Sequence, residues 1–214
     1  FESSSGIGVS GSVGGRKLTL GNTALMDQLR FVVDELKPQA EAMRAQGASV
    51  MFLAVDGQPA GLLAVSDPIK ATTVEALAAL KASGMRVIMA TGDGLTTARA
   101  VAAKLGIDEV HGEVKPADKL ALVDKLQREG RVVAMAGDGI NDAPALAKAD
   151  VGVAMGTGTD VAMNSAQVTL VKGDLRGIAQ ARVISEQTIA NMKQNLGFAF
   201  LYNALGIPLA AGVL

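Results

Sequence analysis

The sequence contains no cysteine and no tryptophan, and it has one histidine and one tyrosine among its 214 residues. The absence of cysteine excludes disulfides and any thiolate metal site in this chain. Aromatic residues make up only 3%, which argues against a stacking platform for single-stranded nucleic acid. Basic residues (20) and acidic residues (21) nearly cancel, so the basic excess of a nucleic-acid-binding protein is missing. We therefore expect no nucleic-acid partner.

A change of pattern at Ser66-Asp67-Pro68 divides the chain. The residues before it predict a small α+β unit with short strands within 1–22, two helical pieces within 23–46, and paired strands at 48–55 and 60–65. The turn Asp56-Gly57 separates the last two strands.

Strands and helices alternate after this point. We expect helices at 72–83, 95–105, 117–129, 142–148 and 159–164, and strands at 85–90, 109–113, 131–136, 150–154 and 167–171. Several of these strands are continuously apolar, as parallel strands covered by helices on both faces are. Residues 66–175 are therefore predicted to form a doubly wound α/β domain with a parallel sheet.

The last part of the chain predicts a linker helix that runs into a membrane helix. Polar positions from residue 174 onward give way to residues 196–214, a stretch of 19 residues without a charge. This length suits a membrane span. Arg182 and Lys193 precede it, which favours a cytoplasmic position for residues 1 to about 194.

Two carboxylates follow the predicted strand 131–136. Asp138 and Asp142 lie four residues apart in the ten-residue string GDGINDAPAL at 137–146. Ligands collect at the carboxyl ends of parallel strands, and hard oxygen atoms on a tight loop suit Mg²⁺. The competing interpretation is a helix N-cap formed by Asn141 or Asp142.

A second group of polar residues lies at other strand ends and helix starts. Thr91, Gly92 and Asp93 follow the strand 85–90, where a hydroxyl and free backbone N–H groups can hold a phosphate. Lys119 lies at the start of another predicted helix, and an ammonium group there can counter phosphate charge. Taken singly, Asp93 is also consistent with a helix cap and Lys119 with an ordinary surface residue.

These strings resemble the phosphate-handling motifs of the haloacid-dehalogenase superfamily, and in particular the heavy-metal P-type ATPases. The resemblance rests on ATGD at 90–93, PADK at 116–119, the string at 137–146 and VGVAMGTGTD at 151–160. It covers essentially the whole chain. It implies three parts: the C-terminal part of a nucleotide-binding domain at 1–65, a phosphorylation domain at 66–175, and a linker helix entering the membrane at 176–214. Asp67-Pro68 would be the hinge between the first two.

The resemblance also implies roles for the site residues. Asp138 and Asp142 would ligate Mg²⁺ with support from Asn141. Thr91 and Gly92 would hold the phosphoryl group, Asp93 would order the loop, and Lys119 would stabilise the phosphoryl charge, which is most of what phosphoryl transfer requires. ATP would contact a set of small residues in the first unit, namely Gly6, Gly8, Gly21 and Asn22, although Gly6-Ile7-Gly8 alone is a weak signal.

The family's nucleophile is absent from this sequence. It is the aspartate of Asp-Lys-Thr-Gly-Thr, a string that this chain does not contain. The resemblance therefore implies that the chain alone cannot form the aspartyl-phosphate. The expected partners are ATP, the remaining domains of the same polypeptide (an actuator domain and other membrane helices) and a copper chaperone.

The pair Tyr202-Asn203 before Pro208 resembles the copper subgroup of these ATPases. In that subgroup the tyrosine and asparagine belong to intramembrane Cu⁺ sites, and polar groups inside a span favour a functional interpretation. The alternative is hydrogen bonding between membrane helices. We therefore expect part of a copper(I)-exporting ATPase. A zinc or cadmium exporter and a soluble phosphatase of the same superfamily remain as alternatives.

Overall fold

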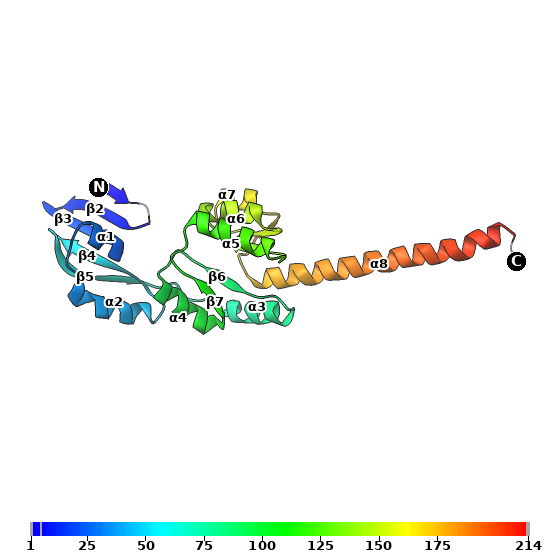
Figure 1. The fold of residues 1–214 in the computed structure, drawn as a ribbon, viewed down its shortest axis with the longest axis horizontal. Coiled ribbons are helices and arrows are strands. Elements are labelled where there is room, and N and C mark those ends of the chain that lie inside the picture. Colours follow the sequence, from blue (N-terminus) through cyan, green and yellow to red (C-terminus); the bar gives the residue numbers. More distant parts are fainter. Residues whose placement is uncertain (1, 5, 213–214) are drawn as a thin grey trace.

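The computed structural model describes residues 2–4 and 6–212. It has an elongated shape with the two termini at opposite ends (Figure 1). A unit of strands and short helices lies at the N-terminal end, an α/β unit occupies the middle, and one long helix projects away from it.

The first unit is built on one antiparallel sheet. Its strands are β1 (Glu2–Ser4), β2 (Gly8–Val13), β3 (Arg16–Gly21), β4 (Ser49–Val55) and β5 (Gln58–Val65), in the order β1-β2-β3-β4-β5. Between β3 and β4 lie α1 (Thr23–Gln28), the 3-10 helix η1 (Asp34–Leu36) and α2 (Lys37–Arg44). Met26 and Phe52 are fully buried in the core between these helices and the sheet. The strands and the two helical pieces confirm the predicted α+β pattern.

The second unit alternates helices and parallel strands. Its elements are α3 (Ala71–Ala82), β6 (Ile88–Ala90), α4 (Leu95–Leu105), β7 (Glu109–His111), α5 (Pro116–Arg128), β8 (Ala134–Gly137), the 3-10 helix η2 (Ile140–Asp142), α6 (Ala143–Lys148), β9 (Val151–Met155), α7 (Asp160–Ser165) and β10 (Val168–Leu170). Leu146 and Ala154 are fully buried where α6 packs on β9. Every predicted element is present, although most strands are shorter than expected.

The strands of this unit do not form the single sheet that the sequence predicts. They form two parallel sheets, one ordered β10-β9-β8 and one that pairs β6 with β7. Strands β6 and β8 therefore each end a sheet, with one edge that pairs with no strand in the described part of the chain. Strands β7 and β10 are the other two edges, and a continuous sheet would need an edge of one sheet to meet an edge of the other, directly or through a further strand.

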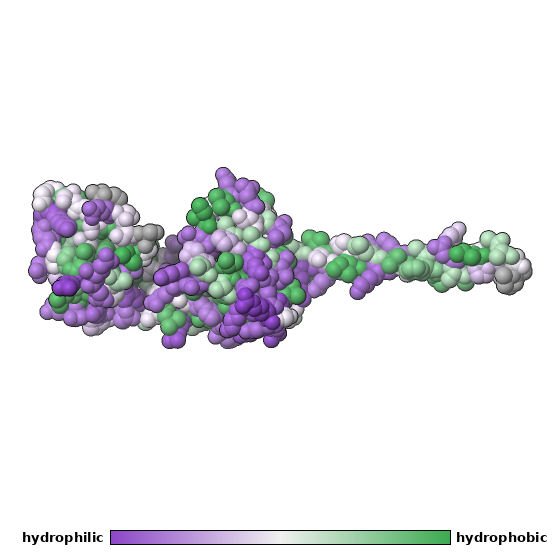
Figure 2. Space-filling model, turned by 45° about the horizontal axis from the view of Figure 1, so that its top comes forward, coloured by the Kyte–Doolittle hydropathy of each residue, from purple (hydrophilic) through white to green (hydrophobic). Residues whose placement is uncertain are grey.

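Helix α8 (Arg176–Ala210) continues without a break from the linker into the apolar stretch. Its surface alternates hydrophobic and hydrophilic patches (Figure 2). Across residues 2–4 and 6–212, no helix reaches the length and apolar character of a membrane span. The membrane span expected at 196–214 is helical as far as Ala210, where α8 ends. Residues 213 and 214 lie outside the described residues.

Polar contacts hold α8 against α3. Arg176 donates from Nη2 to Asp174 Oδ2 at 2.7 Å and lies 3.6 Å from a carboxylate oxygen of Glu75. Lys70, just before α3, donates to the carbonyl of Gly173 at 3.0 Å. The hydrogen bonds from the Arg176 side chain and backbone lower the pKa of Asp174 from 3.8 to about 2.

Candidate functional site

Helix α5 places Lys119 at the site through its N-terminal turn. Pro116 occupies one of the first helical positions, where its missing N–H costs nothing. Asp118 accepts a hydrogen bond from the backbone N–H of Lys115 at 2.9 Å. These residues make α5 begin at Pro116, which places Lys119 at the end of the first helical turn.

Asp142 is the buried carboxylate of the site. Only 6% of the residue is exposed. Its Oδ1 accepts from Lys119 Nζ at 2.7 Å, and its Oδ2 accepts from the backbone N–H of Gly139 at 3.2 Å. The charge of a buried carboxylate is tolerated because both oxygens have partners. Asp142 therefore organises the lysine and the loop. It occupies the N-cap position of α6, but its side chain accepts no hydrogen bond from that helix.

Asp138 lies at the C-terminal end of β8 and is exposed. Its backbone carbonyl accepts from the N–H of Thr159 at 2.9 Å. Gly158 packs so closely that an added Cβ would lie 2.2 Å from the same carbonyl oxygen. The loop before α7 thus fixes the backbone of Asp138 and leaves its carboxylate toward solvent. Asn141 is exposed on η2, next to Asp142.

The loop after β6 forms a separate group of polar side chains. Thr91 Oγ1 donates to Asp93 Oδ2 at 2.9 Å and accepts from the backbone N–H of Asp93 at 3.2 Å. The Thr91 N–H donates to the carbonyl of His111 at 3.0 Å, and the N–H of Val114 donates to the carbonyl of Thr91 at 3.0 Å. Gly92 is exposed between them.

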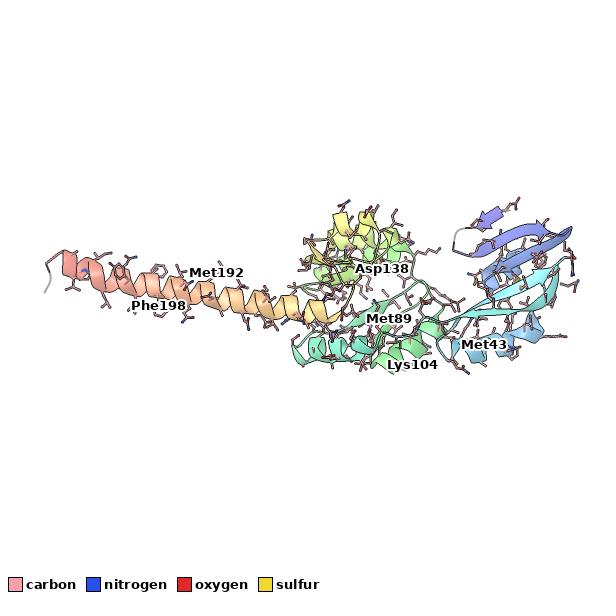
Figure 3. All side chains as sticks on the ribbon, turned by 180° about the vertical axis from the view of Figure 1, so that it is seen from behind. Met43, Met89, Lys104, Asp138, Met192 and Phe198 are labelled. Carbon is pink, nitrogen blue, oxygen red and sulfur yellow. The ribbon has the colours of Figure 1, made fainter. Side chains whose placement is uncertain are left out.

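The four residues expected around one phosphoryl group therefore occur as two groups. Lys119 and Asp142 are bonded to each other beside Asp138, whereas Thr91 is bonded to Asp93 on the other sheet. Among the described residues, no side-chain hydrogen bond joins the two groups. Val114 links them through the chain, because it is bonded to Thr91 and α5 starts two residues later. In Figure 3, Asp138 belongs to the part with α5–α7 and Met89 marks β6 in the part below it.

The small residues expected to contact a nucleotide lie together in the first unit. Gly8 on β2 pairs with Gly21 on β3, and a Cβ at Gly8 would lie 2.4 Å from the carbonyl oxygen of Leu20. Asn22 caps α1 by accepting from the Leu25 N–H, and it also donates to the carbonyl of Gly6 at 3.3 Å. Close strand packing and the helix cap account for these residues, and their contact with a nucleotide stays a prediction.

Tyr202 and Asn203 lie on the distal part of α8. Tyr202 is 77% exposed, and Asn203 is exposed as well. Phe198, one turn before them, is labelled in Figure 3 on the segment of α8 that extends away from Asp138. This pair does not contribute to the phosphate-handling groups.

The oxygen atoms at the end of β8 fit Mg²⁺. This ion is usually bound by one or two carboxylates together with waters and phosphate oxygens. An exposed Asp138 supplies such a ligand, and the described residues contain no cluster of three or more His, Cys, Asp or Glu side chains that could form a closed cage. Each oxygen of Asp142 already accepts one hydrogen bond, from Lys119 or from the Gly139 N–H, and keeps a second lone pair that could face an ion.

Two residues of the site were not found from the sequence. Ser49 donates to Asp93 Oδ1 at 2.6 Å, although 44 positions separate them. Gly158 fixes Asp138 across 20 positions of the chain. A single serine at a strand start carries no local signal of such a contact, and the string VGVAMGTGTD marks Gly158 without indicating its partner Asp138.

Comparison with known proteins identifies related chains. The family model for hydrolases of the haloacid dehalogenase-like type matches residues 3–150. A copper-transporting P-type ATPase of Rhizobium leguminosarum bv. viciae is 58% identical over 214 residues, which are all of this chain and 25% of that protein. A silver exporting P-type ATPase of Salmonella typhimurium is 56% identical over the whole chain and 26% of its own length. The chain thus spans about a quarter of these relatives.

Solved structures agree with the sequence comparison. A zinc-transporting PIB-type ATPase in an E2.Pi state superposes with a TM-score of 0.73 at 30% identity, over 98% of this chain and 34% of that one. The catalytic domain of the CPx-ATPase CopB-B gives a TM-score of 0.59 at 29% identity, over 85% of this chain and 63% of that one. The resemblance predicted from the motifs is confirmed.

Proposed function

We infer the function of this chain from its family: it belongs to the haloacid dehalogenase-like hydrolases. We propose that it is the phosphate-handling part of an ATP-driven, copper(I)-exporting P-type ATPase. The observation that carries the proposal is the bond of 2.7 Å between Lys119 and Asp142 beside the exposed Asp138. A partly buried lysine in the first turn of a helix, bonded beside an open carboxylate, is the charge arrangement that a phosphoryl group and its metal ion require.

We propose a role for each group of residues. Asp138 would hold Mg²⁺, with Asp142 and Asn141 keeping its loop in place. The ion, when bound, would offset the negative charge of the phosphate. Lys119 would bind a phosphoryl oxygen from the other side, and Thr91 and Gly92 would contact the phosphoryl group through a hydroxyl and a backbone N–H. Asp93 would order that loop.

The proposed nucleophile, an aspartate in Asp-Lys-Thr-Gly-Thr, would come from a part of the parent protein outside this chain. The unpaired edges of β6 and β8 support this proposal. A strand that enters between them would join the two sheets and bring its carboxyl end to the loops that carry Thr91 and Asp138.

The chain would comprise the C-terminal part of a nucleotide-binding domain (1–65), a phosphorylation domain (66–175) and a linker helix that leads to the membrane (176–214). ATP would contact the first part near Gly6, Gly8, Gly21 and Asn22. The parent protein would be a membrane protein whose other domains, the actuator domain and further membrane helices, complete the cycle.

Copper is favoured over zinc or cadmium as the cargo. The relatives at 58% and 56% identity carry the names of copper and silver transporters, whereas the zinc-transporting structure is 30% identical. Tyr202 and Asn203 would supply Cu⁺ ligands, as in the copper subgroup that they resemble. A soluble phosphatase of the same superfamily needs neither the first unit nor α8, and both occur here.

The test is phosphorylation of the parent protein by ATP labelled at the γ-phosphate, with Mg²⁺ and Cu⁺ present. Asp138→Ala is expected to abolish the acid-stable phosphoenzyme. Asp108→Ala is the matched control, because the Asp108 side chain is 99% exposed and lies away from the site. Wild-type phosphoenzyme levels in Asp138→Ala would remove Asp138 from the proposed site.

A further inference from the structure

The two units meet at a small polar interface. The segment 41–49 of the first unit faces helix α4 and the loop before it. Three side chains of α4 donate to this segment: Thr97 Oγ1 to the Ala48 carbonyl (2.8 Å), Lys104 Nζ to the Gln46 carbonyl (2.5 Å) and Thr96 Oγ1 to Glu41 Oε2 (3.3 Å). In the other direction, Ser49 Oγ donates to Asp93 Oδ1 (2.6 Å). Thr97 is 4% exposed, so this contact is a packed interface rather than a loose approach.

Of these contacts, only the one from Ser49 reaches the loop 91–93, which is expected to hold phosphate. The carboxylate of Asp93 accepts from Ser49 on one oxygen and from Thr91 on the other. Asp93 thus joins a side chain of the first unit to the hydroxyl expected to hold phosphate.

The bond to Asp93 limits what the Thr91 hydroxyl can donate to a phosphate. A threonine hydroxyl has one proton to donate. In this structure Thr91 donates that proton to Asp93 Oδ2, and the Asp93 N–H donates to the Thr91 oxygen. A phosphate oxygen only accepts hydrogen bonds, so the Thr91 hydroxyl cannot donate to phosphate while it donates to Asp93. The docked arrangement therefore withholds the hydroxyl from phosphate.

We propose that Ser49 and Asp93 form a latch between the two units, which holds Thr91 in a state that cannot donate to phosphate. Release of Ser49 frees Asp93 to turn away, and Thr91 then donates to the phosphoryl oxygen. This inference rests on the proposed phosphate-binding role of Thr91. By linkage, phosphate binding and docking of the first unit oppose each other to the same extent.

The position of Ser49 suits such a latch. It is the first residue of β4 and pairs with Val65, the last residue of β5. Residues 66–70 follow directly, are exposed and lie outside the helices and strands. Rotation about this connection moves Ser49 away from Asp93 without disturbing either sheet, and it also breaks the contacts of Thr96, Thr97 and Lys104 with the first unit. One hydrogen bond to a charged group shifts such an equilibrium by roughly tenfold.

The experiment measures the distance between the units and the affinity for phosphate in the same 214-residue chain. The absence of cysteine allows spin labels at two introduced cysteines only, Ser12→Cys on β2 and Ala78→Cys on α3, both at exposed positions. Distance distributions are recorded by pulsed electron resonance with and without inorganic phosphate and Mg²⁺. Chemical shifts of the Thr91 and Gly92 amides report phosphate binding directly.

Ser49→Ala is expected to broaden the distance distribution without phosphate and to bind phosphate up to about tenfold more tightly. Wild type should move toward the same broad distribution when phosphate is added. Ser49→Thr keeps the hydroxyl and should retain the wild-type behaviour. Ser83→Ala is the matched control, because the Ser83 hydroxyl bonds to the Leu80 carbonyl within the second unit.

An unchanged distance distribution in Ser49→Ala overturns the latch, as does a broadened distribution with unchanged phosphate affinity. If phosphate shifts neither amide in any variant, the proposed phosphate-binding role of Thr91 is wrong, and the coupling proposed here is overturned with it. The distance measured without phosphate still decides separately whether Ser49 docks the units. Amide spectra of each variant verify that it is folded.

Discussion

Lys119 Nζ and Asp142 Oδ1 lie 2.7 Å apart, with 17% and 9% of the two side chains exposed. The pair joins the first turn of α5 to the loop after β8, and the second oxygen of Asp142 accepts from Gly139. A charge-assisted hydrogen bond of this length in a nearly buried setting fixes both partners. The arrangement depends on both charges, since either one alone would be costly to bury.

Lys119→Met removes one charge and keeps the length of the side chain. It leaves Asp142 buried without its counter-ion, so the free energy of unfolding should fall by about 3 kcal/mol. Chemical denaturation measures this change. Lys119→Met combined with Asp142→Asn should recover part of the loss, because the uncompensated carboxylate is gone. An additive double variant would contradict the coupling between the two residues.

Gly158→Ala places a Cβ against the carbonyl of Asp138 and must displace one of the two loops. The carboxylate of Asp138 would move with its backbone, and Mg²⁺ affinity should fall by about tenfold, as for other residues that orient metal ligands. Titration of the chain with Mg²⁺, followed by the Asp138 amide shift, measures the affinity. Gly197→Ala on α8 is the control, because its added Cβ meets no atom within 4 Å. Equal affinities in the two variants would argue against the positioning role of Gly158.

The junction of α3 and α8 should respond to acid. The pKa of Asp174 is lowered from 3.8 to about 2, chiefly by the Arg176 side chain. A carboxylate with a lowered pKa stabilises the folded junction above pH 3.8, and this contribution is lost as the pH falls toward 2. Arg176→Gln should return the pKa of Asp174 toward 3.8. Carboxyl carbon shifts during an acid titration measure both values, and an unchanged midpoint in the variant would assign the shift to another cause.

Copper-dependent turnover of the parent protein tests the residues on α8. Tyr202→Phe and Asn203→Ala remove the proposed Cu⁺ ligands, so the concentration of Cu⁺ that gives half-maximal ATP hydrolysis should rise by about tenfold. Leu205→Ala on the same helix is the control, since its aliphatic side chain has no donor atom for Cu⁺. Normal Cu⁺ stimulation in both variants would instead favour a role of the pair in contacts between helices.

Local patterns predicted the elements well, because each depends on neighbours in the chain. Helix α4 lies at 95–105 as expected, since its hydrophobic spacing starts after Gly94 and ends at Gly106, which takes a left-handed conformation with φ of 64°. The start of α5 was similarly readable from Pro116 and Asp118. Strand lengths were less predictable, since β6 covers only residues 88–90 and strand pairing depends on partners elsewhere.

The arrangement of the site was predicted only in part. Lys119 and Asp142 meet as the motifs indicated, whereas Thr91 lies with Asp93 on the other sheet. The sequence patterns do not reveal that β6 and β8 stay apart, because an apolar strand has the same pattern whichever strand pairs with it. The lack of charge at 196–214 predicts a membrane span, whereas no helix among the described residues has the length and apolar character of one.

The family and the residue types of the site follow from the order of the amino acids alone. In the string GDGINDAPAL, Asp138 and Asp142 are only four residues apart, so their closeness is already set by the order of residues in the chain. Which atoms these carboxylates contact, in contrast, depends on the folded arrangement. Ser49 reaches Asp93 and Gly158 supports Asp138 across long stretches of chain. Contacts of this kind depend on how whole units pack, and packing depends on the combined shape of many side chains rather than on any local pattern.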